Sequence, residues 1–172
     1  MGRLLRKKIP AGKKVPAEYA WIYDLPYSGM VYPDSLSGKF KYALWRVYTP
    51  YHPLVRDLAL KLHIVHHRGR QDWLLGTVAP HLSIQEFVHN LLQQGFGNHF
   101  VAWKDDGELI SLRHTDNFDY QYHLRVFKDR EVRAHYECTP EGHPVMHMKD
   151  NQMEPKREYF LNVLKDTVVV AE

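Results

Sequence analysis

The residues best suited to chemistry lie on two stretches of alternating polar and apolar side chains, YQYHLRVF at 120–127 and EVRAHYE at 131–137. Residues 128–130 separate the stretches, so we expect them to pair as an antiparallel hairpin. Only one register collects the apolar side chains on a single face, because a slip by one residue moves every side chain to the other face. That register pairs Tyr122 with Tyr136, Leu124 with Ala134 and Val126 with Val132.

The same register assigns the polar side chains to the opposite face of the hairpin. It pairs His123 with His135, Arg125 with Arg133 and Gln121 with Glu137. Directly opposed side chains have Cβ atoms about 5 Å apart, close enough for two imidazoles to bind one metal ion. Glu137 would supply a third ligand or a general base, and His143 or His147 would complete the set. The pattern therefore predicts a site for a divalent metal such as zinc, or an acid–base site.

The arginines of this face support a second interpretation. Opposed guanidinium groups repel each other unless acidic neighbours or a bound anion satisfies them, and their geometry suits phosphate or carboxylate. The binding set would then be His123, Arg125, Arg133, His135 and Glu137. Its ligand would be nucleic acid or a phosphorylated molecule, and an anion-binding module is the leading functional prediction. A third interpretation needs no ligand, because one face of an antiparallel sheet is commonly exposed to solvent.

Two segments near the N-terminus suggest partners. Residues 19–32 are rich in tyrosine and would serve a protein-interaction module. Residues 1–16 contain six basic and no acidic residues, more than the net charge of +3 of the whole chain, so the remainder is net negative. We expect residues 1–16 to form a basic, flexible tail that could contact nucleic acid or acidic lipid.

Motifs that would identify a reaction are absent from the sequence. It contains no Walker phosphate loop, no GxGxxG, no GxSxG and no HExxH. The sequence therefore leaves open whether the protein is an enzyme. The alternative enzyme hypothesis is a metal-dependent or acid–base enzyme centred on His123, His135 and Glu137.

Length and composition fit one globular domain, which we place at 17–172. The chain has 172 residues, of which 44% are hydrophobic, enough to bury a core without metal or disulfide. Cys138 is the single cysteine, so no disulfide can form within one chain. No apolar run reaches the roughly 18 residues of a membrane span. These features predict a cytoplasmic protein with no membrane span.

The strongest helix signal lies at 83–94. Ser83 is a predicted N-cap, Glu86 would complete a capping box, and Gly95 stands where a glycine would end the helix. A second amphipathic helix is predicted after Pro155. The closing residues, 167–170, could add an edge strand.

The remaining elements are predicted to be extended. Aromatic and β-branched residues favour a strand at 40–48, and a hairpin is expected between 60–66 and 72–79. Residues 17–36 would cross the domain as extended chain. Further strands are expected at 99–103, 108–114 and 145–148. The predicted fold is α+β, in which antiparallel hairpins and a meander form one sheet with one or two helices packed on a face.

Overall fold

The structure is a computed structural model that describes residues 17–64, 73–98, 107–148 and 156–171. Its α-helices are α1 (Leu36–Tyr48), α2 (His52–Lys61), α3 (Ile84–Gln93) and α4 (Arg157–Leu164). Its strands are β1 (Trp73–Val78), β2 (Glu108–Thr115), β3 (Tyr120–Phe127), β4 (Glu131–Cys138) and β5 (Val168–Val170). Short 3-10 helices are η1 (Ala17–Asp24), η2 (Thr49–Tyr51), η4 (Met146–Met148) and η5 (Lys165–Thr167).

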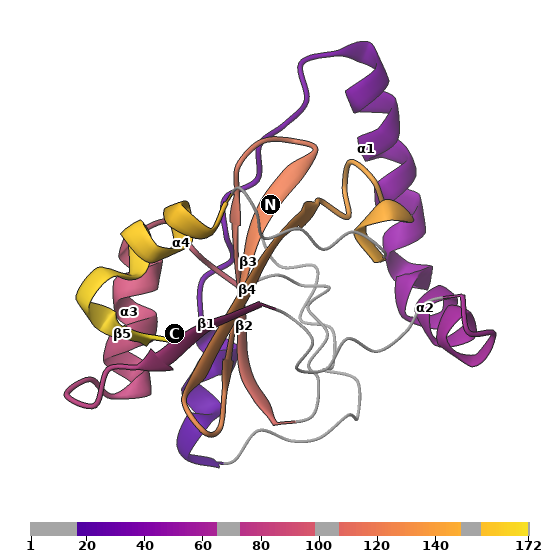
Figure 1. Cartoon of the computed structure of the whole chain (residues 1–172). Coiled ribbons are helices and arrows are strands. Elements are labelled where there is room, and N and C mark those ends of the chain that lie inside the picture. The colour runs from indigo at the N-terminus through magenta and orange to yellow at the C-terminus, as the bar shows by residue number, and fades with distance from the viewer. Residues whose placement is uncertain (1–16, 65–72, 99–106, 149–155, 172) are drawn as a thin grey trace.

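The strands form one antiparallel sheet in the order β2-β3-β4-β1-β5 (Figure 1). This arrangement confirms the predicted α+β fold and the meander of β2, β3 and β4. The register of β3 and β4 is the predicted one, with His123 opposite His135 and Leu124 opposite Ala134. The segment at 167–170 does supply an edge strand, β5, which pairs with β1.

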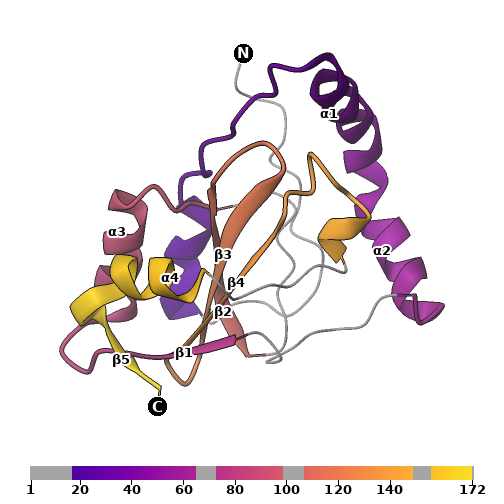
Figure 2. The same cartoon turned by 45° about the horizontal axis from the view of Figure 1, so that its top comes forward.

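One face of the sheet carries the hydrophobic core. The apolar side chains of β3 and β4 are buried there against α3, α4 and η1, which lie on the same side of the sheet (Figures 1 and 2). Phe87 from α3 and Phe160 from α4 are fully buried. The opposite side of the sheet faces η4, beyond which lie α1 and α2. None of the helices in the described residues is long and apolar enough to cross a membrane.

The capping box predicted for α3 is present. The Ser83 hydroxyl accepts a hydrogen bond from the Glu86 backbone N–H at 3.1 Å, and the Glu86 carboxylate accepts one from the Ser83 backbone N–H at 2.8 Å. Gly95 follows the helix with φ of 87°, a left-handed conformation that favours glycine. Local signals alone therefore determine both ends of this helix.

The strand predicted at 40–48 is wrong, because these residues belong to α1. Ser35 caps the helix, and its hydroxyl accepts a hydrogen bond from the Gly38 backbone N–H at 3.0 Å. Phe40, Leu44 and Val47 follow the helical spacing of three and four residues, which outweighs the β-propensity of individual residues.

Three other predicted extended segments are also wrong. Residues 60–64 complete α2 and the turn after it, so β1 pairs with β4 and β5 instead of with that segment. Residues 146–148 form η4, and residues 17–24 form η1. The predicted strand at 99–103 and the tail at 1–16 lie outside the described residues.

A ring cluster fixes the corner between α1 and α2. Trp45, Tyr48 and His52 contact one another with ring centroids 5.6–5.8 Å apart, and both Trp45 and His52 are buried. The His52 Nε2 has no hydrogen-bond partner among the described residues. Burial lowers the pKa of His52 to about 4, and the nearby His147 and Arg56 add to this effect.

We predict that Ser83→Ala lowers the free energy of unfolding by about 1 kcal/mol, because a backbone N–H of the first turn of α3 loses its acceptor. Urea denaturation followed by circular dichroism measures this change. An unchanged denaturation midpoint would contradict the role of the cap.

We predict that His52→Phe makes stability less dependent on pH. The pKa of His52 is about 4 in the folded protein and about 6.5 in the unfolded chain, so its stabilising contribution is present above pH 6.5 and lost as the pH falls towards 4. The variant should lose less unfolding free energy than the wild type over this pH range. His81→Phe, at an exposed position, is the control and should behave as the wild type. Equal losses in all three proteins would contradict the prediction.

Candidate metal centre

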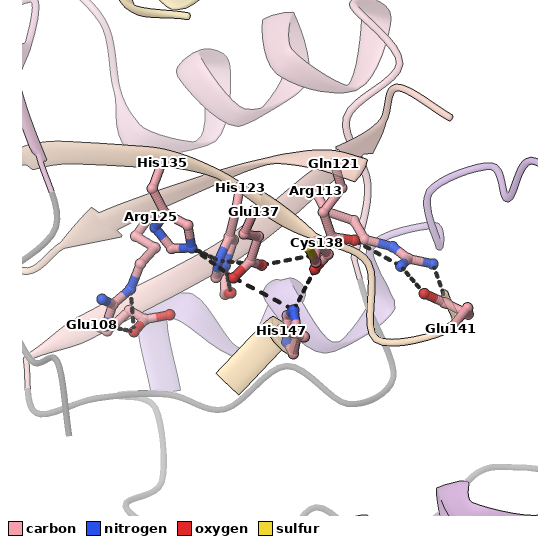
Figure 3. Close-up of polar contacts among 11 residues, drawn as sticks. Glu108, Arg113, Gln121, His123, Arg125, His135, Glu137, Cys138, Glu141 and His147 are labelled. Atoms are coloured by element: carbon pink, nitrogen blue, oxygen red, sulfur yellow. Dashed lines mark hydrogen bonds and ion pairs between the residues drawn. The ribbon is translucent and has the colours of Figure 1, made fainter. Parts of the chain in front are cut away.

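The pairing of β3 with β4 brings two histidines into contact on the polar face of the sheet. His123 Nδ1 lies 3.1 Å from His135 Nε2, and the two rings are nearly perpendicular, at 79°. Glu137, two residues along β4, points to the same place (Figure 3). One ligand atom from each of these three residues lies within 4.8 Å of the others. The structure therefore brings together the central three residues of the predicted site.

The distances among these atoms suit a tetrahedral ion. Glu137 Oε1 lies 3.3 Å from His123 Nδ1, and Glu137 Oε2 lies 2.9 Å from His135 Nε2. Zinc binds nitrogen and oxygen ligands at 2.0–2.2 Å, which in a tetrahedron separates neighbouring ligand atoms by roughly 3.3 Å. These separations are thus close to the spacing of neighbouring ligands around such an ion, with one carboxylate oxygen of Glu137 near each histidine.

A serine on β2 orients His123. The Ser111 hydroxyl lies 2.6 Å from His123 Nε2. If Nε2 carries the ring proton and donates it to Ser111, then Nδ1 keeps its lone pair towards His135 and Glu137. Metal-binding histidines usually have such a partner on their other ring nitrogen.

A buried polar chain orients Glu137. Gln121 Nε2 donates a hydrogen bond to Glu137 Oε1 at 2.7 Å, and Arg113 donates one to Gln121 Oε1 at 2.9 Å. Arg113 also forms an ion pair with Glu141 at 3.0 Å, in which both side chains are at most 4% exposed. Since Arg113 can only donate, it fixes which end of the Gln121 amide faces Glu137.

His147 approaches the cluster from η4. Its Nδ1 lies 2.8 Å from the Cys138 carbonyl oxygen, which only accepts hydrogen bonds, so Nδ1 carries the ring proton. The same atom lies 3.5 Å from Glu137 Oε2 (Figure 3). His147 is therefore a neighbour of Glu137 and not one of the three convergent ligands. His143, the other histidine of this segment, forms an ion pair with Asp119 at 2.9 Å.

The electrostatics favour a charged Glu137 beside a neutral His147. Burial by itself would raise the pKa of Glu137, but its electrostatic interactions with His147 and His135 and its hydrogen bonds with His123 and His135 together hold that pKa well below its usual value. Burial lowers the pKa of His147, against the opposing effect of Glu137. At neutral pH the site thus contains a carboxylate and a neutral imidazole.

The interpretation of this face as solvent-exposed is wrong. Gln121, Arg125, His135 and Glu137 are each only 2–3% exposed. Burial of so many polar groups is tolerated because they are hydrogen-bonded and paired with opposite charge. The β3–β4 part of the sheet is therefore largely buried on both faces.

The two arginines of the predicted anion site are paired with carboxylates. Arg125 Nε donates a hydrogen bond to Glu108 at 2.9 Å, and Arg133 Nε donates one to Glu131 at 3.0 Å. Acidic neighbours thus satisfy the charges that a bound anion would otherwise have met.

Sequence reasoning missed several residues that support the site. Ser111 and Arg113 alternate along β2 and lie opposite Arg125 and His123, so their face could have been inferred from a β2–β3 register. Glu141 lies in a loop, where no periodicity marks it.

Comparisons with known proteins place no constraint on this site. Neither a scan of protein-family models nor searches of curated proteins and solved structures found a match.

We predict that Glu141→Gln destabilises the protein by about 3–5 kcal/mol, because it leaves the buried Arg113 guanidinium without a counter-charge. Glu131→Gln is the matched control. It breaks the more exposed pair with Arg133 and should cost at most about 1 kcal/mol. Chemical denaturation of both variants measures the difference, and equal losses would contradict the structural role of the buried pair.

Proposed function

We propose that the protein binds one divalent transition metal ion, such as zinc, through His123, His135 and Glu137, and that it is a metal-dependent enzyme. The convergence of one ligand atom from each of the three side chains, all within 4.8 Å of one another, is the observation that carries this proposal. This proposal specifies the metal-dependent enzyme hypothesis that the sequence left open.

The charge balance of the polar face supports a cation as the ligand. Arg125 and Arg113 form ion pairs with Glu108 and Glu141, one on either side of the cluster (Figure 3). Glu137 lies between them, and within the described residues its ion pairs are with histidines and its amide contact is with Gln121. A divalent ion would supply positive charge beside this buried carboxylate.

The number of ligands supports catalysis over a purely structural role. Structural zinc sites use four protein ligands, whereas catalytic sites use three and leave a position for water or substrate. A metal ion lowers the pKa of its bound water towards 7 and so makes it a nucleophile at neutral pH. His147 carries its ring proton on Nδ1, the atom that lies 3.5 Å from Glu137, so this neighbour presents a hydrogen-bond donor to the carboxylate side of the site. The expected reaction class is metal-assisted hydrolysis.

Anion binding through His123, Arg125, Arg133, His135 and Glu137 stays a prediction, less well supported because both arginines are paired with carboxylates. The Tyr-rich segment at 19–32 also stays a predicted interaction module. We propose a cytoplasmic location, supported by the single cysteine, Cys138, which cannot form a disulfide within the chain.

We predict that the purified protein binds one equivalent of zinc or cobalt and that His135→Gln abolishes this binding. Ser111→Ala, which removes the partner of His123 Nε2, should weaken metal affinity by about 10- to 100-fold. Isothermal titration calorimetry with each metal, after chelation, measures both effects. His143→Ala is the control and should bind as the wild type, because His143 contacts Asp119 instead.

The cobalt-bound protein can be used to test whether the fourth coordination position of the metal is open to water. If a water molecule occupies it, the visible absorption bands of the cobalt protein should change with pH near neutrality as that water loses a proton. Bands that are independent of pH would indicate a closed, structural site. No binding of either metal by the wild-type protein would overturn the proposal.

A further inference from the structure

The helices α1 and α2 expose an unusual amount of apolar surface. Eight side chains, spaced three or four residues apart from one helix into the next, are each 55–86% exposed. We call these residues the apolar stripe: Leu36, Phe40, Leu44, Val47, Tyr51, Leu54, Leu58 and Leu62. Because the spacing follows the helical period, the members on each of the two helices share one side of that helix. Exposed apolar surface of this extent typically marks a binding surface.

The apolar stripe lies outside the hydrophobic core, although Leu44, Val47 and Tyr51 line a groove with Pro144 and Val145. The buried residues of the two helices, Gly38, Trp45, His52 and Ala59, occupy other positions of the helical period and attach the pair to the fold. Figures 1 and 2 show α1 and α2 at the outer edge of the molecule, across the sheet from α3 and α4. The core therefore leaves this side of the helices unused.

An apolar groove extends the surface towards the loop before η4. The groove has a volume of about 470 Å³, and its lining includes Leu44 and Tyr48 from α1 and Val145 from the loop. Val145 and Met146 are themselves more than half exposed. The apolar surface is thus continuous from the helices to the segment that carries His147.

Positive charge flanks the apolar stripe. Residues 36–64 contain five lysines and arginines and a single acidic residue, Asp57. Lys39, Arg46 and Lys61 are exposed, whereas Lys41 forms an ion pair with Asp119 at 3.5 Å and Arg56 lies beside the buried His52. The partner of this surface should therefore be apolar in part and negatively charged.

This charge argues against a second copy of the chain. Two helix pairs packed against each other through their apolar stripes would bring like charges together, which is unfavourable. Protein interfaces also carry about one hydrogen bond per 100–200 Å², whereas Tyr51 is the only member of the apolar stripe with a side-chain hydrogen-bonding group. A bilayer surface requires no such matching.

We propose that the α1–α2 surface docks on an anionic lipid bilayer. The apolar stripe enters the boundary between headgroups and acyl chains, and the flanking lysines and arginines meet the anionic headgroups. The helices lie in the plane of the surface and do not cross the membrane. Each basic residue near such a surface adds to the attraction, which salt screens.

Vesicle flotation tests the docking proposal. The full chain should float with vesicles of phosphatidylcholine and phosphatidylglycerol and bind vesicles of phosphatidylcholine alone much more weakly. Binding to the mixed vesicles should fall as salt rises, because the screening length shrinks from about 30 Å at 0.01 M to about 3 Å at 1 M. Equal binding to both vesicle types, or to neither, would overturn the proposal.

Substitutions on the apolar stripe test whether this surface is the part of the protein that contacts the bilayer. Val47→Asp and Leu58→Asp should each weaken vesicle binding about tenfold or more. Each substitution removes an apolar side chain that the bilayer would bury and adds a negative charge that the anionic headgroups repel. Val170→Asp is the matched control, because Val170 is 48% exposed on β5, an edge strand of the sheet that lies away from α1 and α2 (Figure 1). Unfolding midpoints should show that all three variants fold.

Further outcomes identify other occupants of the surface. A dimer in light scattering that Val47→Asp converts to a monomer, without vesicle binding by either form, would assign the surface to a second copy. Vesicle binding that survives both α1–α2 substitutions but is lost on deletion of residues 1–16 would assign it to the basic tail. Either result would overturn the proposal. Retained binding by His135→Gln would show that docking is independent of the metal centre.

Discussion

The register between β3 and β4 is the constraint on which the rest of the structure depends. With His123 opposite His135, Tyr122, Leu124, Val126, Val132, Ala134 and Tyr136 enter the core beneath α3 and α4, and the polar side chains of the hairpin face the other way. A slip by one residue would place charged groups in the core and disperse the histidines at the same time. The stability of the fold and the geometry of the candidate metal centre thus rest on the same pairing.

Charge neutralisation allows the polar face to be buried. A buried charge is costly without a partner, and here the ion pairs of Arg125 with Glu108 and of Arg113 with Glu141 keep the two ends of the face neutral. The arginines therefore act as scaffold. Arg113 orients Gln121 towards Glu137, and the centre of the face between the two pairs is where we propose the metal ion.

Patterns local in sequence predicted much of this architecture. The capping residues Ser83 and Glu86 identified α3, and period-two alternation identified the hairpin at 120–137 together with its register. The prediction failed at 40–48, where aromatic and β-branched residues suggested a strand although the apolar spacing was helical. It also failed for the exposure of the polar face, because the position of η4 and the ion pair to Glu141 depend on tertiary contacts that no local pattern encodes.

The candidate metal ligands lie close together in the sequence as well as in space. His123, His135 and Glu137 belong to one hairpin, and their neighbour His147 follows within the next loop, so their mutual contacts close only short segments of chain. Short loops close quickly and at small entropic cost, whereas α1 and the C-terminal α4 must join the sheet over much longer separations. The three ligands can therefore meet early in folding, before the core is complete. A metal ion captured at that stage would hold the hairpin in register and would bias folding towards the native sheet.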